Sequence, residues 1–583
     1  MVAAEGAARL LDPPPQTTGV TIVVGLSAFG RSAAVLVENG EFRAGVCEEQ
    51  FSRQKNDPSM PRQAFRWCCD SVAVAPHDVS YVVLAEKPVQ HALRVVDQLA
   101  GGFPGTFRAF SVAMQSWLGK RLWLKSSVRR ACGVSAERVL FVERNVAQVT
   151  SALLTSRFES AAVLVLDGEG EWAATTLAHG ARDADGHVSL DTFAKIRQPH
   201  DLTAILHAVA SLVRIPVTGG LRRLSTLAAR GRPVYLEELR RIVKTEPDGA
   251  YSVDLRYLDL GGPRAVFSRR GRALLGELEL QGSWDSEAPP EAAADLARSA
   301  QEVVIERCLA LANEAKRRTN ADQLCLGGSL FFDPRIAARL VQEAPFECVH
   351  VDPFLGDAGA ANGAALFVSH VSLGRPQDAT LPLVLSELPS FAVAEFDVQP
   401  RDEDSLIDSA AELLAGGAVV GWIQDAGLPT TAPRAQRAIL TDLGSSRGMA
   451  ALRDVVKGLP AWVPFAVAMP ADLLTTWAGR CMADAARSAQ IAIPVPAALS
   501  EVYPQLPYVD GTMLVQAVDQ DQNPRLARVL DALRHRTGRF PVLAMTSFNR
   551  TGEPSVLSDE DAAEFLLDGG IDALFWGLDE VRV

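Results

Sequence analysis

Glycine turns that follow short apolar runs are the segments of this chain best suited to chemistry, because they could bind the phosphate groups of a nucleotide. They lie at Gly25-Leu-Ser-Ala-Phe-Gly30, Asp167-Gly-Glu-Gly170, Gly327-Gly328 and Gly356-Asp-Ala-Gly359, the last directly before an Ala-rich segment. Glycine lets backbone N–H groups come close to a phosphate, and a glycine turn at a helix N-terminus suits an anion. Taken singly, each turn is better explained as an ordinary loop, so it is their recurrence after strands that favours nucleotide binding.

The elements that must position these turns repeat along the chain. Apolar runs at 21–24, 33–37 and 42–46 predict three strands, and Asn39-Gly40 predicts a two-residue hairpin between the second and the third. A similar strand–turn–strand pattern returns at 161–177, which indicates an internal duplication. Two such units facing a cleft are the arrangement by which the actin/sugar-kinase fold grips a nucleotide.

The second half of the chain predicts a further α/β domain. Residues 291–320 have the spacing of a helix and lead into the strand before Gly327-Gly328, still within the N-terminal domain. Residues 374–390 hold three prolines and predict a linker to the further domain. Beyond it, strands are expected at 418–422, 540–544 and 573–576 and helices at 406–414 and 559–567. We therefore expect a flexible tail at 1–19, an N-terminal domain at 20–373, the linker at 374–390 and a C-terminal domain at 391–583.

Composition excludes several classes of protein. The chain has 583 residues and a formal net charge of −13, so binding of nucleic acid is not expected. No apolar run is long enough to span a bilayer, and the start of the chain lacks the features of a signal peptide. The eight cysteines form no CxxC pair, and no serine has a recognisable His/Asp partner, so neither a zinc ribbon nor a hydrolase is predicted. We expect a cytoplasmic protein with buried thiols such as Cys308 and Cys325.

Motifs along nearly the whole chain resemble one known family, the O-carbamoyltransferases of nodulation factors and of antibiotics such as tobramycin, cephamycin and novobiocin. The most specific match is Thr546-Ser-Phe-Asn549 with Gly552-Glu-Pro554, which is similar to the family's TSFNxxGEP signature. Further matches are Glu48-Glu-Gln-Phe-Ser-Arg53, Glu86-Lys-Pro88, Asp167-Gly-Glu-Gly-Glu-Trp172, Pro199-His200, Gly356-Asp-Ala-Gly359 and Val509-Asp-Gly511.

The resemblance implies an actin-like N-terminal domain that binds ATP near a divalent metal. It also implies a C-terminal domain similar to threonylcarbamoyl-AMP synthases, which takes carbamoyl phosphate, so that carbamoyl-adenylate made at one site is passed to a hydroxyl acceptor. The cofactor-binding candidates on this reading are Asp167, Gly168, Gly170, Gly327, Gly328, Gly356 and Asp357. The catalytic candidates are Arg437, Lys457, Ser547 and Asn549, with Arg434 as a substitute if its loop shifts.

The metal ligands that the resemblance implies are largely replaced. Where the family has three histidines on one helix face, this chain has Arg144, Asn145 and Gln148. Arginine repels a cation, and amides are weak ligands for a transition metal, so iron is not expected. Asp167 and Asp357 remain as remnant carboxylates, which could hold Mg²⁺ with ATP or an adenylate; alternatively, Asp167 only caps its turn.

The carbamoyl phosphate pocket is depleted in the same way. Four arginines of the family fall on Ala426, Ala432, Leu459 and Val463, whereas Arg437 and Lys457 remain. Each lost guanidinium removes charge-assisted hydrogen bonds of about 1.5–3 kcal/mol. Ser547 and Asn549 could still bind a phosphate or carbamoyl group, or form only a structural turn.

Two hypotheses follow from these losses. In the first, the chain is a non-catalytic or regulatory subunit, part of an oligomer, beside an intact carbamoyltransferase paralogue in natural-product biosynthesis. In the second, it is an active transferase with altered chemistry that moves a carbamoyl or acyl group from an adenylate to a small-molecule hydroxyl or amine acceptor.

Overall fold

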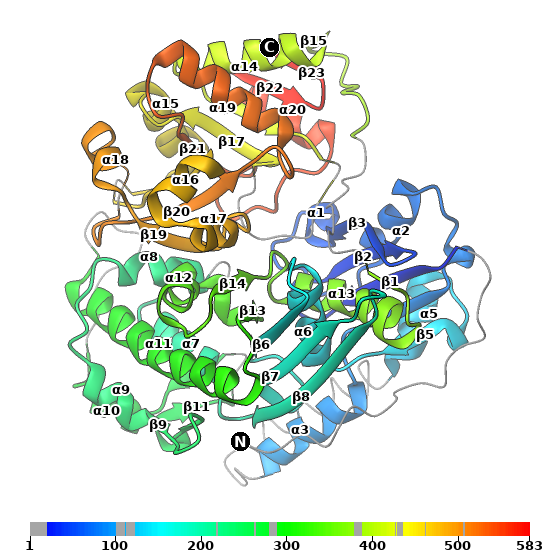
Figure 1. Ribbon diagram of the computed structural model, residues 1–583, viewed down its shortest axis with the longest axis vertical. Helices are drawn as coiled ribbons and strands as arrows, with labels where there is room; N and C mark the ends of the chain where they lie inside the picture. The colour runs from blue at the N-terminus through cyan, green and yellow to red at the C-terminus, as the bar shows by residue number, and fades with distance from the viewer. Residues whose placement is uncertain are drawn as a thin grey trace. The chain divides into compact units, whose positions relative to one another are not determined.

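The chain forms two compact units in the computed structural model (Figure 1). The structure describes residues 20–100, 111, 123–216, 220–261, 264–278, 289–377, 388–425, 427, 435–460, 462–504, 506 and 508–582. Unit 1 comprises the described residues within Met1–Glu48, Asn56–Trp284 and Ala288–Leu381, and unit 2 those within Glu49–Lys55, Asp285–Glu287 and Pro382–Val583. The expected tail at 1–19 and residues 378–387 of the expected linker lie outside the described residues.

The first sheet of unit 1 contains the predicted hairpin. Its strands are β1 (Ile22–Ser27), β2 (Ala33–Glu38), β3 (Glu41–Cys47), β4 (Tyr81–Leu84) and β5 (Val139–Phe141), in the order β3-β2-β1-β4-β5. β1, β2 and β3 are antiparallel, and β4 and β5 run parallel to β1. Asn39 and Gly40 both have positive φ, as a two-residue hairpin turn requires, so the hairpin prediction is confirmed.

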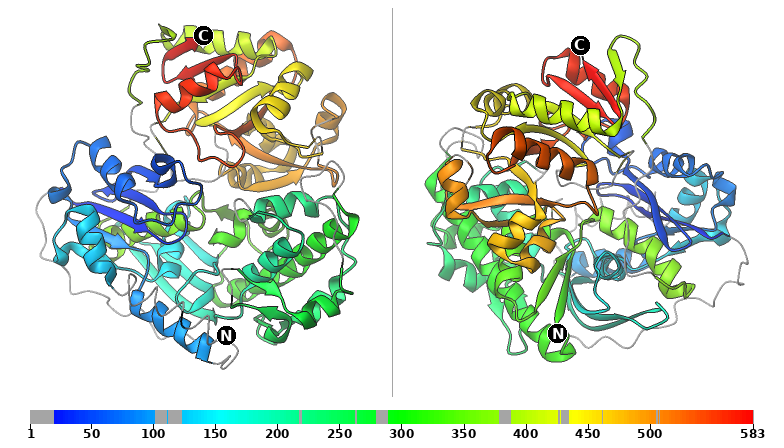
Figure 2. Two further views of the ribbon diagram at one scale, coloured as in Figure 1. Left: turned by 180° about the vertical axis from the view of Figure 1, so that it is seen from behind. Right: turned by 45° about the horizontal axis from the view of Figure 1, so that its top comes forward.

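The second sheet of unit 1 repeats the first strand for strand. It consists of β6 (Ser160–Leu166), β7 (Ala173–Arg182), β8 (Val188–Arg197), β13 (Gln323–Gly327) and β14 (Cys348–Val351), in the order β8-β7-β6-β13-β14. Again the first three strands are antiparallel and the last two run parallel to β6. The views in Figure 2 show both sheets within unit 1. This duplication is the actin/sugar-kinase architecture that the sequence predicts.

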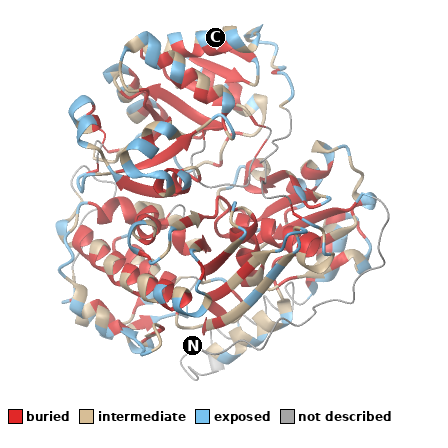
Figure 3. Ribbon diagram, in the orientation of Figure 1, coloured by how far each residue is buried: buried red, intermediate tan, exposed pale blue. Residues whose placement is uncertain are grey.

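Two helices, one from each repeat, pack closely between these sheets. α6 (Arg144–Leu154) and α13 (Asp357–Leu366) touch at Gly363, where an added Cβ would lie 1.6 Å from the carbonyl oxygen of Ala147. Both helices are buried along almost their whole length (Figure 3). The first residue of each helix, Arg144 and Asp357, carries a charge, and both belong to the site described below.

The remaining elements of unit 1 surround this core. The long helix α11 (Glu291–Thr319) buries Cys308, and β13 buries Cys325, so the prediction of buried free thiols at these two positions is confirmed. The other elements are α2 (Arg62–Ser71), α3 (Pro88–Ala100), α5 (Leu124–Cys132), α7 (Leu202–Leu212), α8 (Gly220–Ala228), α9 (Leu236–Ile242), α10 (Arg269–Leu274), α12 (Pro334–Glu343) and the short ribbons β9 (Val243–Thr245) with β10 (Tyr251–Val253) and β11 (Leu258–Asp259) with β12 (Val266–Phe267).

Unit 2 is built on one mixed sheet, in the order β15-β23-β22-β16-β17-β21-β18-β20-β19. The strands are β15 (Asp397–Pro400), β16 (Val420–Ile423), β17 (Arg437–Asp442), β18 (Ala466–Pro470), β19 (Ile491–Pro494), β20 (Thr512–Val518), β21 (Leu543–Ser547), β22 (Ala573–Trp576) and β23 (Asp579–Arg582). The helices are α1 (Glu49–Ser52), α14 (Glu403–Ala415), α15 (Ser446–Ala451), α16 (Ala471–Ala478), α17 (Arg480–Ala486), α18 (Ala497–Val502), α19 (Pro524–Thr537) and α20 (Asp559–Leu567).

One predicted strand of unit 2 is displaced. The sequence predicts a strand at 540–544, but β21 begins at Leu543, because Pro541 has no N–H with which to join the sheet. Within the residues that the structure describes, no helix combines the length and the apolar character needed to cross a membrane.

Candidate functional site

The predicted nucleotide-binding residues of unit 1 come together where two parallel strands end. β6 ends next to Asp167 and the paired β13 ends at Gly327, so the turns that follow both strands lie at the same sheet edge. The Ser329 hydroxyl, beyond that second turn, donates to Asp167 Oδ1 at 3.0 Å. Gln148 on α6 links Asp167 to the carbonyl oxygen of Gly356, directly before α13. The candidates thus gathered are Asp167, Gly168, Gly170, Gly327, Gly328, Gly356 and Asp357.

The centre of this cluster is the guanidinium of Arg144, which contacts three carboxylates. Its Nε lies 3.1 Å from Asp167 Oδ2, its Nη1 2.8 Å from Asp357 Oδ1, and its Nη2 3.2 Å from Glu169 Oε2. Burial acts to lower the pKa of Arg144, but the charges of Asp167, Asp357 and Glu169 outweigh it and hold this pKa well above its ordinary range. Arg144 therefore carries a permanent positive charge among these carboxylates.

The carboxylate of Asp167 already has a full set of hydrogen-bond donors. Oδ2 accepts from Arg144 Nε and Gln148 Nε2, and Oδ1 accepts from the Glu169 backbone N–H and the Ser329 hydroxyl. A carboxylate offers about four acceptor positions, so none remains on Asp167 for a metal. Both oxygens of Asp357 are also bonded, one to Arg144 and one to the backbone N–H of Arg31.

A divalent metal does not fit this arrangement. The Arg144 guanidinium already bonds to both Asp167 and Asp357, so a divalent ion would have to displace it from these two carboxylates. Asn145, which falls on another histidine position of the family, donates its amide to Thr176 Oγ1 at 3.2 Å and is fully buried. The sequence leaves open whether Asp167 holds Mg²⁺ or caps its turn, and the geometry favours the cap, reinforced by the ion pair with Arg144.

Two of the candidate glycines are required by the packing of the protein itself. An added Cβ at Gly168 would lie 2.3 Å from a carboxylate oxygen of Asp201, and one at Gly170 would lie 2.0 Å from Asn145 Oδ1. Asp201 caps α7 by accepting from the Thr203 backbone N–H at 2.8 Å, and burial raises the pKa of Asp201 to about 6. Glycine at these two positions is thus explained without a bound nucleotide.

Two acidic residues of the site are not among the candidates predicted from the sequence. Glu169 pairs with Arg144, and Glu171 accepts hydrogen bonds from the backbone N–H groups of Lys87 at 2.7 Å and of Arg144 at 3.1 Å. Burial raises the pKa of Glu171 to about 7. The alternation of acidic residues at 167, 169 and 171 is the signal in the sequence that could have identified both.

The four catalytic candidates of unit 2 lie near the ends of two paired strands inside its sheet. β17 and β21 are antiparallel, so Arg437 at the start of β17 lies near Ser547 at the end of β21. Lys457 Nζ donates to the carbonyl oxygen of Ser547 at 3.0 Å, to Asn549 Oδ1 at 2.6 Å and to the carbonyl oxygen of Asn549. The Ser547 hydroxyl also donates to Asn549 Oδ1, at 2.6 Å. Lys457, Ser547 and Asn549 therefore form one hydrogen-bonded cluster.

The ammonium of Lys457 is fully engaged within this cluster. An ammonium has three donors, and the three acceptor oxygens around Lys457 match them. Burial, together with the charge of Lys55, lowers the pKa of Lys457 to about 7. The Asn549 amide in turn donates to the carbonyl oxygen of Glu553 at 2.6 Å, which closes the turn.

The guanidinium of Arg437 forms its hydrogen bonds with acceptors outside this cluster. It contacts Asp425 Oδ1 at 3.3 Å through Nε, the carbonyl oxygen of Val556 at 2.7 Å through Nη1, and the carbonyl oxygen of Asp425 through Nη2. Each nitrogen of its guanidinium therefore has an acceptor within unit 2. The alternative candidate Arg434, with Ala426 and Ala432, lies outside the described residues.

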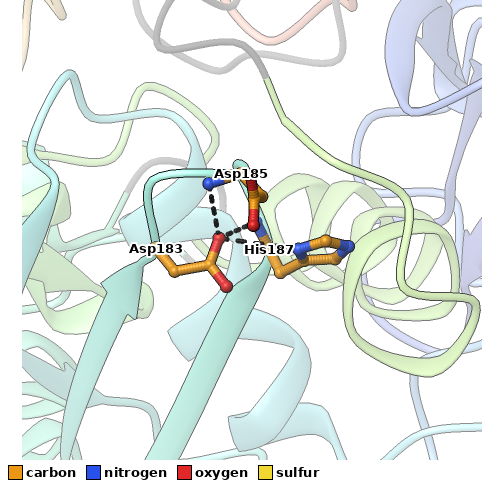
Figure 4. A group of neighbouring side chains, drawn as sticks. All are labelled: Asp183, Asp185 and His187. Carbon is orange, nitrogen blue, oxygen red and sulfur yellow. Dashed lines mark hydrogen bonds and ion pairs between the residues drawn. The ribbon is translucent and has the colours of Figure 1, made fainter.

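A separate group of possible metal ligands lies at the surface, at the β7–β8 turn (Figure 4). Asp183 accepts from the backbone N–H groups of Asp185 at 3.0 Å and His187 at 2.8 Å, and these hydrogen bonds lower the pKa of Asp183. All three side chains are exposed. The group is accounted for as a hairpin turn stabilised by its own acidic residue.

Comparison with known proteins gives consistent matches over most of the chain. The family description "Carbamoyltransferase N-terminus" matches residues 22–366, and "Carbamoyltransferase C-terminus" matches residues 411–581. The chain is 28% identical to the protein sll1178 of Synechocystis sp., over 93% of this chain and 94% of that one. It is 26% identical to the nodulation protein NolNO of Sinorhizobium fredii, over 94% of this chain and 78% of that one.

Among solved structures, the chain is similar to a xylulose kinase from Lactobacillus acidophilus. The identity is 9%, the match covers 62% of this chain and 91% of the kinase, and the TM-score is 0.28. This likeness is too distant to support an inference about activity.

Proposed function

The chain belongs to the carbamoyltransferase family, and we propose that it acts as a non-catalytic or regulatory subunit beside a catalytically intact member of that family. The observation that carries the proposal is that Lys457 and Arg437, the cations retained from the carbamoyl phosphate pocket, are buried and bonded to acceptors of the protein itself. The motifs that resemble those of the O-carbamoyltransferases of nodulation factors and antibiotics, together with the 26% identity to the nodulation protein NolNO, are what supports a role in the biosynthesis of a natural product.

The physical reasoning concerns charge. Carbamoyl phosphate carries about two negative charges at neutral pH, by analogy with phosphate monoesters, and its capture depends on charge-assisted hydrogen bonds. Lys457 would have to leave three acceptors to reach such a ligand, and Arg437 would have to leave the carboxylate of Asp425. Leaving a buried carboxylate without its cation costs several kcal/mol, about 3–5 in measured cases. The chain alone is therefore a poor receptor for carbamoyl phosphate.

The first experiment measures the full-length chain by itself. Phosphate release from radiolabelled carbamoyl phosphate is followed with ATP and Mg²⁺, for the natural chain and for Lys457→Met. We expect both to stay at the background of a reaction without protein. Turnover by the natural chain that Lys457→Met abolishes would overturn the non-catalytic assignment.

The second experiment tests the partner. The chain is co-expressed with a carbamoyltransferase from the same genome that retains the histidine run, and affinity purification of one protein is followed by detection of the other. We expect a stable complex and a change in the turnover of the intact enzyme. If the intact enzyme does not bind the chain and its turnover is the same with and without the chain, the chain is not its subunit.

Nucleotide binding separates this proposal from the alternative of a transferase that takes a preformed adenylate. Calorimetry with ATP and with AMP, at millimolar ligand, is expected to show no saturable binding. Stoichiometric binding of AMP, lost in Asn549→Ala, would favour the adenylate-dependent transferase with a small-molecule acceptor instead.

A further inference from the structure

Charge is distributed unevenly along this chain. Residues 214–272 of unit 1 hold thirteen Lys or Arg against six Asp or Glu, whereas residues 391–583 of unit 2 hold 15 against 26. The whole chain has a formal net charge of −13, so the basic segment has the opposite sign to the rest of the protein. Surfaces of opposite charge steer two molecules together and fix the register of their contact.

The exposed part of the basic segment lies around the short helix α10 of unit 1 (Figure 1). Arg269, Arg270 and Arg272 are exposed, and among the described residues none of the three forms an ion pair with a carboxylate. Like charges this close together on one helix repel each other. A negatively charged partner would therefore relieve a repulsion that the folded chain leaves uncompensated.

The backbone holds α10 in a fixed position. The Ser268 hydroxyl donates to the carbonyl oxygen of Arg256 at 2.8 Å, and the Ser268 N–H donates to the carbonyl oxygen of Tyr257 at 2.9 Å. An added Cβ at Gly271 would lie 2.3 Å from the same Tyr257 oxygen, so α10 packs closely on the 3₁₀ helix Leu255–Tyr257. The arginines of α10 are thus presented on a preorganised surface, which lowers the entropic cost of binding.

Apolar side chains border these arginines. Leu255 of the 3₁₀ helix and Val266 of β12 are each 39% exposed. The acid opposite Val266 in the β11–β12 pair is Asp259, whose carboxylate accepts from the Gly261 N–H at 2.9 Å. Exposed apolar groups beside arginines are typical of protein–protein interfaces. We call the set Leu255, Val266, Arg269, Arg270 and Arg272 the arginine face.

Unit 2 carries a surface of the opposite charge on α20. Glu560, Glu564 and Leu567 follow one another at intervals of four and three residues, so they lie on one side of the helix. Both glutamates are exposed, and Leu567 is 60% exposed. Within the described part of the chain neither glutamate pairs with a cation, whereas the nearby Asp568 pairs with Arg550. We call Glu560, Glu564 and Leu567 the glutamate face.

We propose that this protein self-associates, with the arginine face of one copy bound to the glutamate face of another. The contact brings unpaired guanidiniums to unpaired carboxylates and covers Leu567 with Leu255 and Val266. The net charge of −13 opposes nucleic acid or an anionic membrane as the partner, and exposed apolar groups suit a protein better than a phosphate backbone. This inference does not rest on the proposed function.

The geometry of such a contact follows from the difference between the two faces. A contact between unlike surfaces is heterologous, so each copy retains one free face of each kind until a ring closes or an open chain forms. Association therefore depends on protein concentration. It also depends on salt, because exposed charges are screened at high ionic strength.

The first experiment is sedimentation velocity of the full-length chain at increasing protein concentration. We expect species larger than one chain, which dissociate as NaCl is raised from about 0.05 M to about 0.5 M. The arginine-reversed variant is Arg269→Glu with Arg270→Glu, and the glutamate-reversed variant is Glu560→Arg with Glu564→Arg. Each should weaken self-association by about tenfold or more, since it places like charges opposite one another.

The matched control reverses two neighbouring arginines outside the arginine face. Arg129→Glu with Arg130→Glu changes exposed residues of α5 and should leave self-association unchanged. All the substituted side chains are exposed, so each variant should unfold at nearly the temperature of the natural chain.

Mixing the two reversed variants tests whether the faces meet each other. Neither variant should associate alone, but an equimolar mixture should form complexes that contain both, because each retains a face that matches its partner. A single chain that carries all four substitutions should regain self-association, since both of its faces have exchanged sign. Loss in each variant without recovery in the mixture would show that these faces do not bind each other and would overturn the proposal.

Three other results would also refute it. The first is a natural chain that stays monomeric at about 100 µM, and the second is self-association that neither reversal weakens. The third concerns polyanions, probed with duplex DNA and with phosphatidylserine vesicles. If the natural chain binds either probe and the arginine-reversed variant loses only that binding, the arginine face serves a polyanion instead of a second copy.

Discussion

Replacing Arg437 by methionine should destabilise unit 2 rather than only weaken the binding of a ligand. Arg437 begins β17 and is 9% exposed, and its partner Asp425 is 1% exposed. The change to methionine keeps an unbranched side chain of similar length but leaves the Asp425 carboxylate buried without its cation. The carbonyl oxygen of Val556, which accepts from Arg437 at 2.7 Å, also loses its donor.

The size of the effect follows from these contacts. Removing one partner of a buried ion pair costs about 3–5 kcal/mol, and whole domains are stable by only about 5–15 kcal/mol. In a double-mutant cycle with Asp425→Asn, the charge that Arg437 compensates is already gone, so the two changes together should cost about 2–3 kcal/mol less than their sum. The matched control is Arg447→Met, because Arg447 pairs with Asp572 at the surface with 72% of its side chain exposed, and such pairs contribute at most about 1 kcal/mol.

The assay is urea unfolding, followed by hydrogen–deuterium exchange of the peptides that cover β16 and β17. These two strands pair through Ile423 and Arg437, so exchange there reports the perturbed edge directly. We expect a large fall in the midpoint for Arg437→Met and almost none for Arg447→Met. If Arg437→Met unfolds like Arg447→Met and only loses affinity for carbamoyl phosphate, then Arg437 is a ligand-binding residue and the reasoning fails.

Three further predictions concern unit 1. Gly363→Ala should destabilise it by about 3 kcal/mol, since the added Cβ would meet the backbone of α6, whereas Gly220→Ala, with no atom nearer than 3.7 Å, should have little effect on the melting temperature. Because burial raises the pKa of Glu171, the folded protein loses stability as the pH rises from 4.5 to about 7. Glu171→Gln should therefore be more stable than the natural chain at pH 8, by up to about 3 kcal/mol, and its stability should change less with pH over this range. Burial lowers the pKa of His207 to about 4, so stability is lost as the pH falls from 6.5 to about 4, and His207→Gln should remove up to about 3 kcal/mol of that loss. A stability–pH curve that neither substitution changes would refute the pKa shifts of Glu171 and His207 on which both predictions depend.

Much of the fold could be predicted because its signals are local. The Asn39-Gly40 hairpin depends on two adjacent residues that adopt positive φ, and the duplication is visible because the same strand–turn–strand pattern occurs twice. The strand at 540–544 was misplaced because the apolar pattern includes Pro541, which cannot join a sheet.

The candidate site was predicted in its residue types but not in its bonding. The sequence places arginine and amides where the family has histidines, and that alone removes the imidazole ligands. It does not tell whether Arg144 points to solvent or to Asp357, because the two residues are 213 positions apart and no local pattern relates them.

The sequence by itself therefore determined the family, the duplicated architecture and the side chains available at each site, since these follow from residue identity and short-range periodicity. Only the tertiary structure decided whether those side chains are available to a ligand. The Arg144 guanidinium, the Lys457 ammonium and the Arg437 guanidinium are each bonded to acceptors from segments distant in the chain. Whether a cation is neutralised within the protein or left for a substrate depends on distances of a few ångströms between such segments, which folding alone establishes.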